Sequence, residues 1–243
     1  AYVRTFGAYR RKRRSYGAAK KSASLSGRKT DFFCNAENRF RCCGQNAHSV
    51  FRRRYSVILH KTDEKAASLC VDFLKRGKIL ILPTDTVYGF SGIVESGKKI
   101  FRTEEKIRAI KGRDEGKPFI RLIAHPDEIR RYAKDAVPAS LLAKWPGALT
   151  IIVNDGTGGT AAYRCPGDAW LRAVIAQSGP VYSTSVNKSG KPVLEKISDI
   201  IETFEGDVDL IISSGDTSGA LPSTIVDISS GTLRVLRQGC VQV

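Results

Sequence analysis

The chain contains short apolar runs and longer amphipathic stretches. Runs of mostly apolar residues, of the length of buried strands, occur at 79–82, 119–123, 149–153, 181–184, 210–212, 224–228 and 233–237. Apolar residues spaced three or four apart predict helices, at 62–76, 100–110, 126–132, 139–144, 168–177 and 197–204. Strands and helices do not alternate strictly, so we expect an α/β fold with helices packed on a twisted, mixed sheet.

The first predicted helix has recognisable ends and an apolar side. It opens at Thr62, whose hydroxyl suits an N-cap, and acids follow in the first turn, where the helix dipole favours them. Gly77 is expected to end it. Cys70 falls among its apolar positions and is expected to be a buried core residue.

Candidate chemistry gathers between Ile79 and Ile120. The apolar run stops at Pro83, and the hydroxyls and carboxylate of 84–88 follow, where an α/β protein usually places ligand groups. Three cations broken by glycines come after the next helix, at Lys111, Arg113 and Lys117. Cations are also common at an ordinary helix C-terminus. The alternative is a loop that holds a polyanion against a rigid scaffold.

The basic character of the chain is concentrated at its N-terminus. The formal net charge is +16, and residues 1–56 hold 15 Lys and Arg against two acids. We expect 1–56 to be a disordered, low-complexity tail and 57–243 to form the folded domain. Such an Arg-rich, acid-poor segment is typical of an organelle transit peptide or of a nucleic-acid-binding arm. A third interpretation is an extension without function.

The six cysteines and three histidines show no metal-ligand spacing, so we expect no structural zinc site. Reduced thiols favour a cytoplasmic location, with a mitochondrion or plastid as the alternative if the tail is a transit peptide. No apolar run approaches the ~20 residues of a membrane span.

Further polar motifs follow in order along the chain. They are the segments Lys144–Thr150 (Lys-Trp-Pro-Gly-Ala-Leu-Thr), Arg164–Pro166 (Arg-Cys-Pro), Thr184–Gly190 (Thr-Ser-Val-Asn-Lys-Ser-Gly), Pro222–Asp227 (Pro-Ser-Thr-Ile-Val-Asp) and Leu236–Gly239 (Leu-Arg-Gln-Gly). With Pro83–Gly89 and the Lys-Gly-Arg of 111–113, this set resembles the YrdC-like family of threonylcarbamoyl-AMP synthases. The resemblance covers about residues 62–243.

The resemblance implies one YrdC-like domain whose twisted sheet and helices surround a deep basic cleft. It implies synthesis of L-threonylcarbamoyl-AMP from L-threonine, bicarbonate and ATP with Mg²⁺, and release of pyrophosphate. The product would pass to the transferase machinery that forms threonylcarbamoyladenosine at position 37 of tRNAs reading codons that begin with A.

The resemblance also implies roles for particular residues, while no protein ligand for a metal is expected. The catalytic residues would be Lys111 and Arg113; ATP would bind to Lys111, Arg113, Lys117, Thr160, Asn187 and Arg237; and L-threonine would bind to Thr86, Arg164, Ser185 and Ser223.

The chemistry of these residue types suits that reaction. Loss of pyrophosphate needs cations around a triphosphate, and the arginine fork suits a carboxylate. Residues two apart in an extended chain point to one side, so Lys111 with Arg113, and Ser185 with Asn187, could each face one ligand. Catalysis would then rest on positioning and electrostatics.

Two other functions compete. One is a double-stranded RNA or tRNA-binding module without synthase activity, since a basic tail binds nucleic acid non-specifically. The other is a carbamoyl-transfer domain like that of hydrogenase maturation proteins, which we expect less because the accessory domains of those proteins are missing from this sequence.

Overall fold

The computed structural model describes residues 56–96, 100–114, 116 and 118–243. Nearly all of the basic segment predicted as a tail therefore lies outside the described residues, and so does Lys117. The predictions made for those positions stay predictions.

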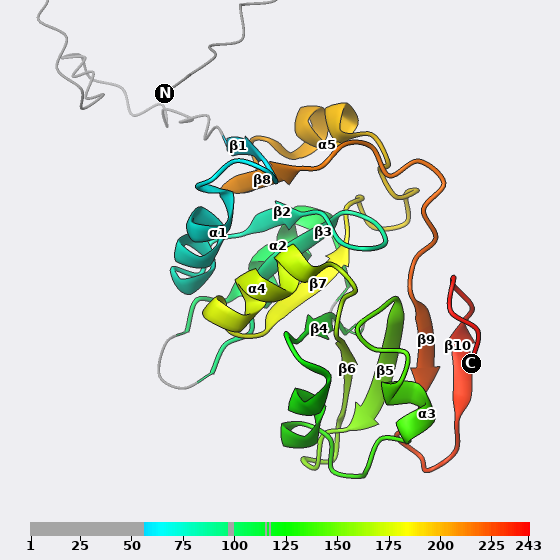
Figure 1. Cartoon of the computed structure of the whole chain (residues 1–243). Helices are drawn as coiled ribbons and strands as arrows, with labels where there is room; N and C mark the ends of the chain where they lie inside the picture. The colour runs from blue at the N-terminus through cyan, green and yellow to red at the C-terminus, as the bar shows by residue number, and fades with distance from the viewer. Residues whose placement is uncertain (1–55, 97–99, 115, 117) are drawn as a thin grey trace, which may run out of the picture. The chain divides into compact units, whose positions relative to one another are not determined.

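The described strands form one ten-stranded sheet in the order β1-β8-β2-β3-β7-β4-β6-β5-β9-β10 (Figure 1). Neighbouring strands run both parallel and antiparallel, as in β2 with β8 and β2 with β3. The α/β class and the mixed sheet are thus confirmed. The strands are β1 (Val57–His60), β2 (Leu80–Leu82), β3 (Gly89–Ile93), β4 (Ile120–Leu122), β5 (Leu149–Asn154), β6 (Thr160–Arg164), β7 (Val181–Ser185), β8 (Leu210–Ser213), β9 (Thr224–Asp227) and β10 (Arg234–Arg237).

All seven predicted strands are present, but the sequence analysis missed β1, β3 and β6. The middle of the sheet explains two of these omissions. Strand β3 reads Gly-Phe-Ser-Gly-Ile and β6 reads Thr-Ala-Ala-Tyr-Arg, and nearly every residue of both is buried. A strand buried on both faces shows no alternation of apolar and polar residues, and glycine and alanine are poor strand formers.

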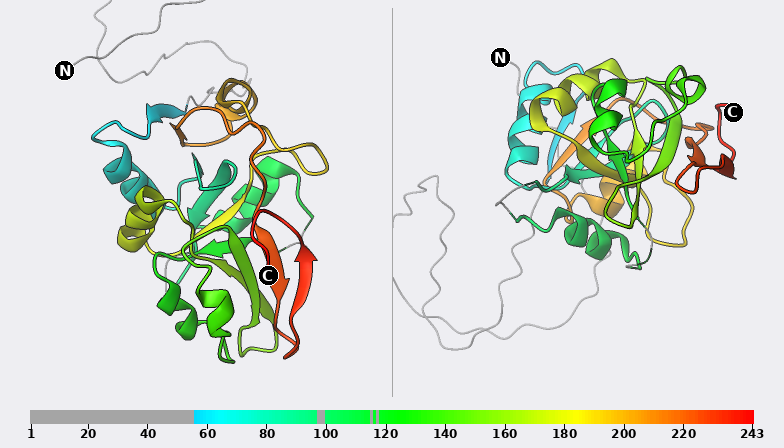
Figure 2. Two further views of the ribbon diagram at one scale, coloured as in Figure 1. Left: turned by 45° about the vertical axis from the view of Figure 1, so that its right-hand side comes forward. Right: turned by 90° about the horizontal axis from the view of Figure 1, so that it is seen from below.

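Helices cover both faces of the first half of the sheet (Figures 1 and 2). Helices α1 (Ala66–Lys75) and α4 (Ala169–Ser178) share one apolar cluster, which contains Cys70 as expected. Helices α2 (Thr103–Lys111) and α5 (Ile197–Phe204) share another. The short α3 (Ala139–Leu142) and the 3₁₀ helix η1 (Pro126–Arg131) pack with β5, β6 and β9 in the second half.

The expected N-cap at Thr62 is wrong. Helix α1 begins at Ala66, and Lys65 occupies its N-cap position without a side-chain hydrogen bond. The Thr62 hydroxyl instead pairs with Nδ1 of His60 at 2.7 Å. In contrast, α4 has a side-chain cap, because Oδ1 of Asp168 accepts a bond from the backbone N–H of Leu171.

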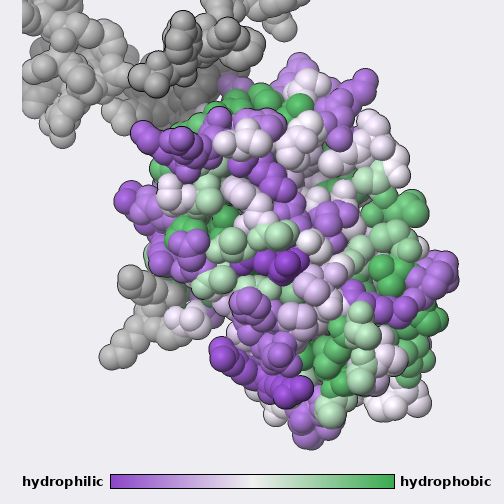
Figure 3. Space-filling model, viewed as in Figure 1, coloured by the Kyte–Doolittle hydropathy of each residue, from purple (hydrophilic) through white to green (hydrophobic). Residues whose placement is uncertain are grey.

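The surface of the described residues is mostly polar, with apolar areas on the side where β10 lies (Figure 3). Leu233, Val235 and Leu236, in or beside this edge strand, are each about half exposed. None of the described helices has the length and apolar content that crossing a membrane requires.

Truncation of Phe90 tests how much its contact with helix α5 stabilises the core. Phe90 of β3 is fully buried and meets the ring of Phe204 of α5 edge to face, with centroids 4.9 Å apart. We expect Phe90→Ala to lower the free energy of unfolding by about 3–5 kcal/mol. Urea denaturation measures this, with Leu221→Ala as the control because Leu221 is 58% exposed. Equal losses in the two variants would contradict the assignment of Phe90 to the core.

Candidate functional site

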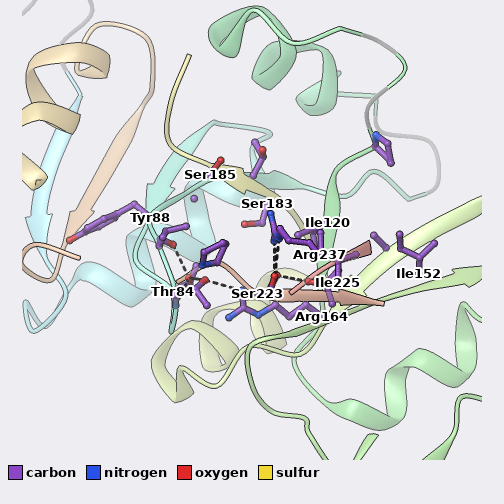
Figure 4. A pocket seen from close by; sticks show the side chains of 18 of the residues that line it. Thr84, Tyr88, Ile120, Ile152, Arg164, Ser183, Ser185, Ser223, Ile225 and Arg237 are labelled. Carbon is purple, nitrogen blue, oxygen red and sulfur yellow. Dashed lines mark hydrogen bonds between the residues drawn. The ribbon is translucent and has the colours of Figure 1, made fainter. Parts of the chain in front are cut away.

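Seven neighbouring strands, from β3 across to β10, contribute to the lining of one cavity of about 220 Å³ (Figure 4). A flat sheet could not bring strands so far apart in the order around one small space, so the sheet must curl around it. The lining residues are Thr84, Thr86, Val87, Tyr88, Gly89, Arg113, Pro118, Ile120, Thr150, Ile152, Ala162, Arg164, Ser183, Thr184, Ser185, Pro222, Ser223, Ile225 and Arg237.

Arg164, at the end of β6, is a buried cation of the cavity wall. Its side chain is only 6% exposed. Its Nε donates to the carbonyl oxygen of Gly147 at 3.0 Å, and its Nη1 donates to Oγ1 of Thr86 at 2.9 Å. Its Nη2 donates to Oδ1 of Asp85 at 2.7 Å, which forms an ion pair. Each nitrogen of the guanidinium therefore has an acceptor, and the plane of the group is fixed.

The loop after β2 carries the hydroxyls that meet Arg164. Oγ1 of Thr84 donates to the carbonyl oxygen of Val87 at 2.8 Å and lies 3.0 Å from Oγ1 of Thr86. Because a hydroxyl has one hydrogen, Thr86 must be the donor of that second bond. The bonds then run in one direction, from Arg164 to Thr86 to Thr84, and the loop is held in place by its own side chains.

A second arginine reaches the cavity from the edge of the sheet. Arg237 of β10 donates from Nε and Nη2 to the carbonyl oxygen of Ser223 and from Nη2 to the Ser223 hydroxyl, as Figure 4 shows. The Ser223 hydroxyl also lies 2.8 Å from that of Thr150 in β5. The side chains of Ser223 and Thr150 are buried, so these bonds tie β5, β9 and β10 together beside the cavity.

The lining contains three arginines, Arg113, Arg164 and Arg237, and no acid. Burial lowers the pKa of Arg237, and the positive charge of Arg164 lowers it further. Burial and the charge of Arg108 likewise lower the pKa of Arg113. Cations held this close together favour an anionic ligand, because an anion relieves their mutual repulsion.

Lys111 lies behind the cavity wall instead of in it. It is the last residue of α2, and its side chain is buried. Its ammonium donates to the carbonyl oxygens of Ser185 and Asn187 and to the amide oxygen of Asn187. Lys111 thus joins the end of α2 to the turn after β7. Burial, with the charge of Arg113, lowers the pKa of Lys111 to about 8.

The structure brings six of the predicted site residues together around the cavity: Thr86, Arg113, Arg164, Ser185, Ser223 and Arg237. Lys111 and Asn187 bind each other next to the wall, and the exposed Thr160 begins β6 after the glycine-rich turn. The functional roles predicted for all of these residues stay predictions.

Neither predicted pair lies wholly in an extended chain, because β7 ends at Ser185 and the chain bends at Val186 and Asn187. Ser185 and Asn187 do face the same way, since the Ser185 hydroxyl donates to the amide oxygen of Asn187 at 2.9 Å. Lys111 and Arg113 are not in an extended chain, because Lys111 is helical and Gly112 turns the chain with a left-handed conformation.

Asp85 and Thr150 were not predicted as site residues. Both fall inside motifs that the sequence shows, Pro83–Gly89 and Lys144–Thr150. Spacing alone could not reveal that their side chains bind Arg164 and Ser223. Among the described residues, no three His, Cys, Asp or Glu side chains gather as a metal site would require.

Comparison with known proteins gives a consistent set of relatives. A family model that covers Sua5, YciO and YrdC, described as "Telomere recombination", matches residues 72–239. A protein named threonylcarbamoyl-AMP synthase from Pyrococcus abyssi is 30% identical over 196 residues, which are 75% of this chain and 56% of that protein. A putative threonylcarbamoyl-AMP synthase from Methanocaldococcus jannaschii is 28% identical over 77% of this chain and 94% of the relative.

Solved structures show the same likeness. Sua5 of P. abyssi in complex with L-threonine has a TM-score of 0.66 and 28% identity, over 75% of this chain and 57% of that one. YciO of E. coli shares the fold, with a TM-score of 0.66 over 78% of this chain and 96% of YciO. The chain therefore spans little more than half the length of the P. abyssi relative.

The pH dependence of stability tests the burial of Lys111. Its pKa falls from an ordinary 10.5 to about 8 in the folded protein. Between these values the unfolded chain binds more protons than the folded chain, so the folded state gains stability as the pH rises. Between pH 7.5 and 9.5, the free energy of unfolding of the wild type should rise by about 2 kcal/mol relative to that of Lys111→Met. Urea titrations of both proteins measure this, and a constant difference would contradict the lowered pKa.

Proposed function

The chain belongs to the Sua5, YciO and YrdC family, and on that premise we propose that it makes L-threonylcarbamoyl-AMP from L-threonine, bicarbonate and ATP. One observation carries the proposal. Thr86, Arg164 and Ser223 come from three motifs far apart in the sequence, and they line one cavity beside two further arginines. The names of the P. abyssi and M. jannaschii relatives support the same reaction.

The cavity suits a small amino acid in its enclosed part. Its volume of about 220 Å³ is below the roughly 300–1,000 Å³ of pockets that hold drug-sized ligands. Arg164 has five N–H groups and uses three of them within the protein, so one N–H on each terminal nitrogen is left for the carboxylate of L-threonine. Hydroxyls such as those of Thr86 and Ser223 can bind its amino and hydroxyl groups. The P. abyssi Sua5 structure with L-threonine supports this choice of ligand.

ATP would extend from this enclosed part toward Arg113. Arg113 lines the cavity, and its guanidinium also lies over the ring of Phe119, 5.1 Å from the centroid. A cation on a loop beside a rigid ring can neutralise phosphates without a P-loop. ATP would enter as its Mg²⁺ complex, in which the phosphates themselves supply metal ligands.

The reaction then follows from the substrates. The threonine amine attacks the carbon of bicarbonate, and the adduct loses water and becomes an N-linked carbamate. An oxygen of the carbamate attacks the α-phosphorus of ATP, and the bond to the β-phosphate breaks as pyrophosphate leaves. The protein holds the two reactants in line and balances the charge of the departing pyrophosphate. We infer that the product is passed, in the cytoplasm, to a transferase that modifies adenosine 37 of tRNAs reading codons that begin with A.

The direct test is pyrophosphate release from ATP, Mg²⁺, bicarbonate and L-threonine. We expect release that requires both bicarbonate and L-threonine and that falls strongly when L-serine, which lacks the methyl group, replaces threonine. Release that is equally fast without an amino acid would contradict the proposed reaction.

Two arginine variants test how the substrates divide the cavity. We expect Arg113→Ala to weaken ATP binding by one to two decades, the equivalent of about 1.5–3 kcal/mol for one lost charge-assisted contact. Arg164→Lys keeps the charge opposite Asp85 but loses the fork, so it should weaken L-threonine binding and leave ATP affinity nearly unchanged.

Calorimetric titration of each ligand into each of these variants gives the four dissociation constants. Arg108→Ala is a suitable control, because Arg108 also lies over the Phe119 ring but does not line the cavity. If Arg164→Lys lost ATP and kept threonine, the assignment of the two arginines would be reversed.

Removal of the basic segment tests where the activity resides. We expect a protein without residues 1–55 to keep threonine-dependent pyrophosphate release, because every predicted site residue follows that segment. Its affinity for double-stranded RNA should fall, with a shallower dependence on salt, because fewer phosphates are neutralised. A folded, truncated protein that makes no adenylate would contradict this expectation.

A further inference from the structure

Asp85 is the acid that pairs with Arg164, yet it does not line the cavity. Its carboxylate oxygen Oδ1 accepts a bond from Nη2 of Arg164 at 2.7 Å, and its side chain is 20% exposed. The cavity lining includes both Thr84 and Thr86 but passes over the residue between them. Asp85 therefore binds Arg164 from outside the cavity lining.

The other oxygen of Asp85 lies against the backbone of Gly167. A methyl group built on Gly167 would stand 2.8 Å from Oδ2 of Asp85 and 3.3 Å from its carboxylate carbon. The three heavy atoms closest to that position all belong to Asp85. Gly167 does not have a left-handed backbone, so the conformation itself allows a side chain. What a side chain at position 167 would disturb is the placement of the Asp85 carboxylate.

Asp85 and its neighbour Thr86 together hold the two terminal nitrogens of Arg164. The carbonyl oxygen of Gly147 holds the third nitrogen. Removing the negative charge of Asp85 would leave the buried guanidinium with neutral acceptors only, beside the positive charge of Arg237. A buried cation that loses its partner is strongly disfavoured, so Arg164 would move or turn.

We propose that Asp85 is a positioning residue, which fixes the guanidinium of Arg164 to receive the carboxylate of the ligand, and that residue 167 is glycine so that Asp85 can reach it. The identity of the ligand as L-threonine rests on the proposed function. The positioning of Arg164 does not, and it can be measured in the protein without substrates.

Two variants disturb Asp85 in different ways. Asp85→Asn keeps the shape and removes the charge, while Gly167→Ala keeps the charge and pushes the carboxylate away. The matched control is Asp209→Asn. Asp209 forms an ion pair of similar exposure with Lys78, at 3.0 Å and with a side chain 23% exposed, but it does not line the cavity.

Arginine side-chain NMR measures the positioning directly. A guanidinium whose two terminal nitrogens are both hydrogen-bonded rotates slowly and gives separate signals, which Arg164→Lys assigns by their loss. We expect the separate signals of Arg164 to merge or vanish in Asp85→Asn and in Gly167→Ala and to persist in Asp209→Asn. Unchanged Arg164 signals in Asp85→Asn would overturn the proposal. Asp85→Asn alone decides this point if Gly167→Ala does not fold.

Binding and kinetics connect the positioning to the ligand. We expect Asp85→Asn and Gly167→Ala each to raise the dissociation constant and KM for L-threonine about tenfold, with ATP affinity changed less than twofold. Adding Gly167→Ala to Asp85→Asn should cost little more, since both act through one carboxylate. The proposal would be overturned if the effects of the two substitutions on L-threonine affinity were fully additive, or if each substitution weakened L-threonine and ATP binding equally.

The proposed function can fail separately. If the wild-type protein neither binds L-threonine nor releases pyrophosphate, the ligand is wrong. The loss of the Arg164 signals in Asp85→Asn would still support the positioning role.

Discussion

The site depends on keeping one positive charge, that of Arg164, inside the protein. A buried cation costs free energy unless it is paired and fully hydrogen-bonded, and Arg164 has Asp85, Thr86 and the carbonyl oxygen of Gly147 as its acceptors. These partners come from the loop after β2 and from the turn before β5, which are far apart in the sequence. The requirement to satisfy Arg164 therefore ties the two halves of the sheet together at the place where the cavity forms.

Contacts in the centre of the sheet and at its β10 edge accompany its curl around the cavity. Strands β4 and β6 run parallel in its centre, and the small residues of β6, such as Ala161 and Ala162, are buried there. On the far side, Arg237 binds both the carbonyl oxygen and the hydroxyl of Ser223. Gly239 lies so close to the backbone of residues 222–224 that a methyl group on it would stand 2.1 Å from the carbonyl oxygen of Pro222. Glycine at this position lets the last segment of the chain close the cavity wall.

Local patterns in the sequence predicted most of the fold, and the ordered motifs predicted six of the residues that line the cavity. The seven apolar runs are strands because their patterns reflect burial directly. Strand β3 was missed because its glycines serve tight contacts, as at Gly89, where a methyl group would stand 2.7 Å from the Ser183 hydroxyl. The burial of Lys111 and the pairing of Asp85 could not be predicted, because both depend on partners that only the folded chain brings near. In the sequence, a lysine in an exposed loop cannot be told from a buried lysine that hydrogen-bonds one element to another.

The most direct test of this account is a crystal structure of the protein with L-threonine and a non-hydrolysable ATP analogue. The account predicts that the threonine carboxylate lies on the Arg164 guanidinium, with Asp85 still paired behind it, and that the phosphates extend past Arg113. A structure in which threonine binds elsewhere, or in which the phosphates occupy Arg164 and displace Asp85, would contradict it.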